Sequence, residues 1–190
     1  MAYQVERIRK DFPSLNTGLA YFDGPGGTQT PKVVGDAIAK AITEPLSNQG
    51  VTTESEKNAE SYVVEYRSAV ADLLNCDPKG VVYGRSWTQL TYDFSRTLAK
   101  SWGVGDEIII SQLDHDSNIR PWVQAAEAKG ATVKWAKVNT QTSELDTSSV
   151  TDLLTPKTKF VAVTGPQTHL ALSLISRQLA KRLKQMAHCF

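Results

Sequence analysis

The second half of the chain alternates short β-branched runs with amphipathic stretches, and this alternation restricts the fold more than any other feature. The expected strands are 80–83, 107–111, 131–135 and 159–164, and the expected helices are 89–101, 118–129, 147–154 and 173–187. Strands that alternate with helices predict crossover connections, and hence parallel pairing with helices on both faces of the sheet. The expected fold class is therefore α/β, with three α/β/α layers around a mostly parallel sheet.

The first half of the chain is expected to be helical, with one glycine-rich turn. A short helix is expected over residues 5–12, and the extended stretch 20–23 leads into the turn 24–27. Pro31 suits the first turn of a following helix. Residues 59–74 place apolar side chains at the three- and four-residue spacing of a helix. No internal repeat or low-complexity linker interrupts these segments.

Composition argues against several kinds of protein and partner. The 190 residues suffice for one domain, and 21 basic against 20 acidic residues give no reason to expect a nucleic-acid partner. No apolar run is long enough to span a bilayer, and the N-terminus is charged, unlike a signal-peptide core. Cys76 and Cys189 form no disulfide framework, and the histidines and cysteines show no metal-ligand spacing. A cytoplasmic location and no bound metal are expected.

Residues 105–122 contain the most informative candidate site. The run 107–111 brings His115 to the end of an expected buried strand, just before a helix. Ligands bind at this end of the strands in open α/β sheets. An imidazole placed there can lie flat on a planar cofactor ring. The alternative is that His115 caps the next helix or makes an ordinary hydrogen bond.

A second candidate is the turn 84–89, Gly-Arg-Ser-Trp-Thr-Gln, which follows an expected strand and opens a helix. Free backbone N–H groups at a helix start, together with the Ser86 and Thr88 hydroxyls, can form a phosphate cradle. The alternative is an ordinary N-cap. The glycine-rich turn 24–27 has neither Walker nor dinucleotide-binding spacing, and by itself it is only a turn. No nucleophile elbow of the GxSxG type is present.

Several segments together resemble the class V aminotransferase family, in its cysteine desulfurase-like branch. The segments that carry this resemblance are 21–31, 84–89, 114–122, 130–135, 144–146 and 154–164. They keep the family's order from about residue 3 to residue 164. The resemblance implies a fold type I PLP-transferase large domain and pyridoxal 5′-phosphate (PLP) as cofactor.

The resemblance also implies roles for individual residues. His115 is expected to stack on the PLP ring. Three residues are expected beside the PLP phosphate: Ser86, Trp87 and Thr88. Three residues are expected near the substrate or the dimer interface: Gly26, Gly27 and Thr28. Complete relatives would act on cysteine or a similar amino acid, cleave a bond at its α- or β-position, and pair as homodimers.

The resemblance fails after Thr164. Thr168 stands where the family has an asparagine that approaches the cofactor's O3′ side, and Ala171-Leu172 replaces a glycine-threonine turn. The family's Schiff-base lysine, its pyridinium-pairing aspartate and the desulfurase cysteine belong beyond the last residue. No catalytic residue is therefore expected in this chain. The expectation is a truncated or frameshifted relative or a domain fragment, with residues 1–30 as an N-terminal helix and glycine-rich segment and 31–190 as an incomplete large domain.

An incomplete sheet has consequences for folding. The strand 80–83 is expected to lack its usual neighbour, and the strand at 160–163 to present an unpaired edge. Two other functions remain open. One is a non-catalytic module that binds PLP or phosphate without the Schiff-base lysine. The other is an interaction protein using the basic face of the final helix, which contains Arg177, Lys181, Arg182 and Lys184.

Overall fold

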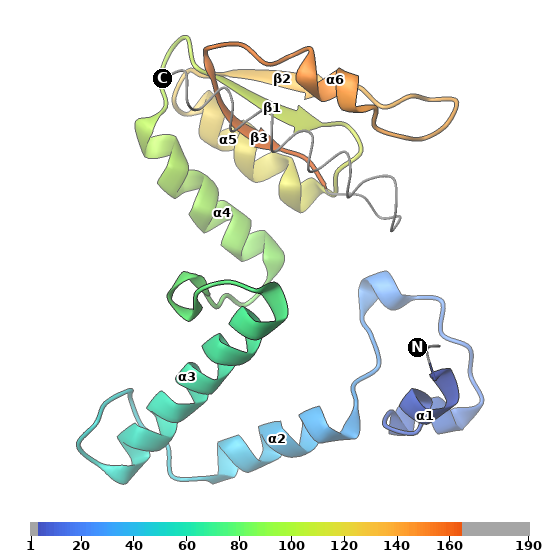
Figure 1. Cartoon of the computed structure of the whole chain (residues 1–190), viewed down its shortest axis with the longest axis vertical. Helices are drawn as coiled ribbons and strands as arrows, with labels where there is room; N and C mark the ends of the chain where they lie inside the picture. Colours follow the sequence, from blue (N-terminus) through green and yellow to red (C-terminus); the bar gives the residue numbers. More distant parts are fainter. Residues whose placement is uncertain (1–3, 165–190) are drawn as a thin grey trace. The chain divides into compact units, whose positions relative to one another are not determined.

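The computed structural model describes residues 4–164, and the chain divides into two compact units, Met1–Val82 and Tyr83–Phe190 (Figure 1). The predicted helix 173–187, with its basic residues, and Thr168 lie outside the described residues. The domain boundary expected after residue 30 stays a prediction. Within residues 4–164, no helix combines the length and the apolar character needed to cross a membrane.

The first unit is helical in its described part. Its long helices are α2 (Lys32–Thr43) and α3 (Glu54–Leu74), and its short elements are α1 (Val5–Arg9), η1 (Pro13–Thr17), η2 (Gly24–Gly26) and η3 (Pro78–Gly80). A capping box starts α3: the Glu56 N–H donates to the Thr53 hydroxyl, and the Glu56 carboxylate accepts from the Thr53 N–H. The helix ends at Asn75, which adopts the left-handed conformation. Local capping thus defines both ends of α3.

The loop between α2 and α3 is fastened to α3 by side-chain hydrogen bonds. The Tyr62 hydroxyl donates to the Glu44 carboxylate at 2.6 Å, and Asn58 donates to the Pro45 carbonyl at 3.2 Å. In contrast, α3 buries only Ala71 and α2 buries no residue. Polar contacts therefore connect these two helices more than apolar burial does.

The second unit is built on a parallel sheet with the strand order β2–β1–β3. The central strand β1 (Glu107–Ser111) pairs with β2 (Thr132–Ala136) and with β3 (Thr158–Ala162). Helix α5 (Arg120–Glu127) connects β1 to β2, and α6 (Thr147–Thr151) lies between β2 and β3. The α/β class and the parallel pairing predicted from the sequence are confirmed.

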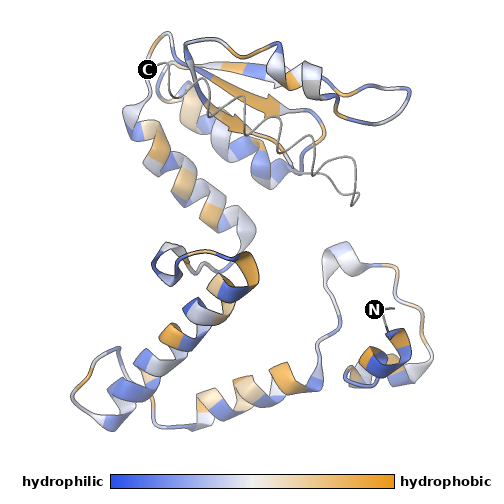
Figure 2. Ribbon diagram, in the orientation of Figure 1, coloured by the Kyte–Doolittle hydropathy of each residue, from blue (hydrophilic) through white to orange (hydrophobic). Residues whose placement is uncertain are grey.

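Successive residues of β1 face opposite sides of the sheet, and this places the core in two layers. Ile108 and Ile110 pack in a cluster with residues of α5, and Ile109 packs with Val150 of α6. The side chains of all three isoleucines are fully buried. A central parallel strand covered on both faces favours such an uninterrupted apolar run, which Figure 2 shows along β1. The three-layer arrangement follows.

One predicted strand is wrong. Residues 80–83 form the end of η3 and an irregular segment without sheet pairing. A strand forms only with a hydrogen-bonded neighbour. Within residues 4–164 β3 pairs with β1 alone, so residues 80–83 are not paired with its other side. Among the described residues β3 is an edge strand, as expected for the strand at 160–163. The helices at 5–12 and 147–154 are also shorter than predicted.

An ion pair joins the first residue of β1 to β2. Lys134 Nζ lies 2.7 Å from Glu107 Oε2, and the Thr155 hydroxyl donates to the same carboxylate. Both hydrogen bonds lower the pKa of Glu107 below its ordinary value of 4.5, and the bond from Lys134 has the larger effect. A lowered folded-state pKa means that this stabilisation is complete above the unfolded pKa. It is lost as the pH falls through the folded pKa.

We therefore expect Glu107→Gln to lower the urea midpoint of unfolding at neutral pH. The difference from the wild-type chain should shrink as the pH falls below about 4.5, because the unfolded chain takes up the proton first and the folded carboxylate only at a lower pH. Urea titrations at several pH values measure this difference. Asp93→Asn is a suitable control, because its ion pair with Arg96 is largely exposed. If the difference in urea midpoint stays constant through the acid range, the Glu107–Lys134 ion pair is not its cause.

Candidate functional site

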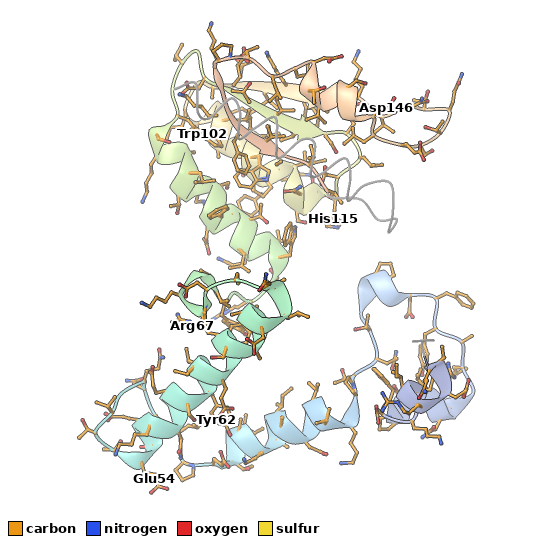
Figure 3. All side chains as sticks on the ribbon, viewed as in Figure 1. Glu54, Tyr62, Arg67, Trp102, His115 and Asp146 are labelled. Carbon is orange, nitrogen blue, oxygen red and sulfur yellow. The ribbon has the colours of Figure 1, made fainter. Side chains whose placement is uncertain are left out.

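His115 lies just beyond the carboxyl end of β1, as the N-cap of the turn η5 (Asp116–Asn118) that leads into α5 (Figure 3). Its Nδ1 accepts a hydrogen bond from the Ser117 backbone N–H at 3.1 Å and lies 2.8 Å from the Ser117 hydroxyl. A backbone N–H can only donate, so the neutral ring carries its proton on Nε2. The capping role of His115 is thus confirmed. Stacking on a cofactor ring stays a prediction.

Asp114, directly before His115, is buried and accepts hydrogen bonds on both carboxylate oxygens. Oδ1 accepts from Asn118 Nδ2 at 2.8 Å and from the Thr164 hydroxyl. Oδ2 accepts from the Thr164 N–H at 3.1 Å and from the Ser111 hydroxyl. One carboxylate therefore joins the ends of two neighbouring strands at the edge where ligands bind in such sheets. Sequence analysis missed this network, for which the only signal was an acidic residue beside His115.

The aromatic part of the core supports the network. The Trp122 Nε1–H donates to Asn118 Oδ1 at 3.0 Å. An indole N–H can only donate, so the Asn118 amide oxygen faces Trp122 and its nitrogen faces Asp114. Trp122 is buried, and its ring centroid lies 4.2 Å from that of Phe160 in β3. The packing of Trp122 against Phe160 thus fixes the indole, and the indole in turn orients the Asn118 amide.

The predicted phosphate turn lies at the start of α4 (Trp87–Leu98). The Ser86 hydroxyl is the N-cap and accepts from the Gln89 N–H at 3.1 Å, which confirms the capping alternative. Within residues 4–164, the N–H groups of Trp87 and Thr88 make no hydrogen bond. Unsatisfied donors at a helix start suit an anion, and the capping hydroxyl can still donate its own hydrogen. The side chains of Ser86, Trp87 and Thr88 are exposed.

Gly84 opens this turn in close contact with α4. A Cβ at this position would lie 2.4 Å from Cγ and Cδ2 of Leu90, so only glycine fits without movement. Helix α4 also packs against η5 and α5. The helix of the predicted phosphate turn and the turn carrying His115 are therefore neighbours within one unit.

The remaining predicted residues belong to the first unit. Gly26 ends η2, Gly27 has a φ of +156°, which favours glycine, and Thr28 is exposed. Their place near a substrate or a dimer interface stays a prediction. In the part of the chain that the structure describes, no group of three or more His, Cys, Asp or Glu residues could hold a metal ion.

Known proteins are similar to this chain over most of its length. A model of the family described as aminotransferase class V matches residues 20–190. An uncharacterized protein of Mycobacterium tuberculosis is 38% identical over 167 residues, which are 86% of this chain and 41% of that protein. A cysteine desulfurase of Dickeya dadantii is 30% identical over 200 residues, 98% of this chain and 46% of its own. The crystal structure of the Escherichia coli cysteine desulfurase CsdA matches with a TM-score of 0.71 at 26% identity, over 85% of this chain and 41% of that one. The chain spans less than half the length of these relatives.

Proposed function

Because the chain belongs to the class V aminotransferase family and corresponds to the N-terminal portion of cysteine desulfurase-like members, we propose that it provides the PLP-binding part of an enzyme acting on cysteine or a similar amino acid. Class V aminotransferases and their cysteine desulfurase relatives are PLP-dependent. The observation that carries this proposal is the position of His115, beyond the carboxyl end of β1 and in the same unit as the open N-terminus of α4.

The residues present fit this cofactor. The N–H groups of Trp87 and Thr88 and the hydroxyls of Ser86 and Thr88 are donors for a phosphate. The exposed imidazole of His115 is held through Nδ1 and offers its ring to a planar partner. When bound, PLP supplies an electron sink for the amino-acid substrate. The part proposed for these residues is to bind and orient the cofactor.

We expect His115→Asn to weaken PLP binding up to about tenfold, the range of an aromatic stacking contact. Asparagine keeps a side-chain acceptor for the Ser117 N–H but removes the ring, so this variant separates stacking from capping. A fluorescence titration of the 190-residue chain with PLP measures the affinity. Gln112→Ala, at an exposed neighbouring position, is the control. Unchanged affinity in His115→Asn would rule out the stacking role.

A second candidate function is supported only by the unbonded N–H groups at the N-terminus of α4. A non-catalytic module would bind PLP or phosphate reversibly through the donors of Trp87 and Thr88. Inorganic phosphate would then bind as tightly as PLP, and His115→Asn would change neither affinity. A borohydride-stable PLP adduct at one lysine would contradict purely reversible binding.

The same proposal includes a homodimer and a cytoplasmic location. Its support is the resemblance to the cysteine desulfurase-like family and the matched relatives. Sedimentation of the chain over a range of concentrations measures the association, and a monomer at every concentration would contradict the dimer.

A further inference from the structure

We propose that Asp114 is a positioning residue of this site, whose carboxylate holds the turn carrying His115 against the end of β3. The inference rests on the proposed function only where it concerns PLP. The placement of His115 itself can be measured without any cofactor.

The distribution of donors around Asp114 supports this role. Each carboxylate oxygen accepts one hydrogen bond from an N–H group and one from a hydroxyl. Asn118 Nδ2 and the Thr164 hydroxyl donate to Oδ1, and the Thr164 N–H and the Ser111 hydroxyl donate to Oδ2. A hydroxyl can turn and accept instead, but an N–H cannot. Each oxygen is therefore tied to a group that can only donate.

The surroundings fix the direction of these donors. Trp122 orients the Asn118 amide so that its nitrogen faces Asp114. The Ser111 oxygen accepts from the Leu113 N–H at 3.1 Å, so its own hydrogen is left for Asp114. The site is thus arranged around two acceptor oxygens before any ligand binds.

An amide at position 114 cannot satisfy this arrangement. Its –NH₂ group would face the Thr164 N–H if it replaced Oδ2, or Asn118 Nδ2 if it replaced Oδ1. Either orientation leaves two N–H groups opposed in a buried place, which separates the end of β3 from the turn. The Cα of Asp114 is bonded through one peptide unit to His115. A shift of this turn therefore moves the imidazole and weakens its contact with the Ser117 N–H.

The two ends that Asp114 joins are far apart in the sequence. Thr164 follows β3, fifty residues after Asp114. Asp114 thus sets the spacing between the turn that carries His115 and the end of β3.

The test compares Asp114→Asn with Val150→Ala in the 190-residue chain. Val150 is buried in the cluster on the other face of the sheet, so its truncation destabilises the unit without touching the turn. Nitrogen NMR of the histidine rings, with His115 assigned by its loss in His115→Asn, reports the protonation of Nδ1. PLP affinity is measured on the same samples.

In Asp114→Asn we expect the His115 Nδ1 resonance to move toward the position of a mixed tautomer, and the Kd for PLP to rise severalfold, by no more than the roughly tenfold expected for His115→Asn. Val150→Ala should change neither. An unmoved His115 resonance in Asp114→Asn, or an equal movement in Val150→Ala, would overturn the inference. If the wild-type chain binds no PLP, the proposed function fails while the ring resonance still decides the role of Asp114.

Thr164→Val serves as a second variant if Asp114→Asn does not yield a spectrum. This variant removes one hydroxyl donor to Oδ1 and keeps the backbone N–H. A smaller movement of the His115 resonance in the same direction supports the inference, and no movement overturns it.

Discussion

Replacing Trp122 with alanine is expected to lower the free energy of unfolding of the second unit by about 3–5 kcal/mol. Trp122 is 3% exposed and belongs to the cluster that covers one face of the sheet. Its ring packs against Phe160, at a centroid distance of 4.2 Å, and edge-on against Phe94 at 6.4 Å. Alanine would leave a cavity between α4, α5 and β3 and would remove the hydrogen bond that orients Asn118.

Trp122→Phe separates the two contributions. Phenylalanine keeps most of the ring packing but leaves Asn118 Oδ1 without its donor, so we expect a smaller loss of about 1–2 kcal/mol. Circular dichroism in a urea series measures both variants. Equal losses would show that the hydrogen bond outweighs the packing. A loss below about 1 kcal/mol in Trp122→Ala would contradict the assignment of Trp122 to the core.

The sequence predicts the sheet well because its strongest signals are local. Three consecutive isoleucines favour a central strand that is covered on both faces, and β1 is such a strand. Gly130, in the turn between α5 and β2, has a φ of +70°, a conformation that favours glycine.

The segment 80–83 shows where local signals are insufficient. Its β-branched residues have the propensity for a strand, yet pairing depends on a neighbour that the segment cannot provide itself. Among residues 4–164 the sheet ends at β3. Strand propensity without a partner therefore gives an irregular segment.

The candidate site is also predictable only where its signals are local in the sequence. His115 and the start of α4 are recognisable because each follows from a short motif in a strand–turn–helix context. The Asp114 network depends on Thr164, which is distant in the sequence, and on the orientation of Asn118 by Trp122. Such contacts follow only from the packing of the whole unit. The hydrogen bonds of Ser86 and His115 show a cap at each residue, and the cofactor contacts proposed for them stay predictions.

Gly84→Ala is expected to have the second large effect, lowering the free energy of unfolding by about 1–3 kcal/mol and weakening the binding of PLP. The added Cβ would lie 2.4 Å from Leu90, well inside van der Waals contact. Relief requires either another rotamer of Leu90 or a shift of the α4 N-terminus. A shift would disturb the Ser86 cap and the donors of Trp87 and Thr88.

Two further variants identify the cause. Gly80→Ala adds the same methyl group where no atom lies within 4 Å, so it should change neither stability nor affinity appreciably. Leu90→Ala removes the atoms that Gly84→Ala would strike, so the double variant should be more stable than the sum of the single effects predicts. Because the clash lies at the helix start, the double variant should also regain affinity for PLP. Additive losses would instead mean that contact with Leu90 is not the cause, and that Leu90 does not set the position of the turn.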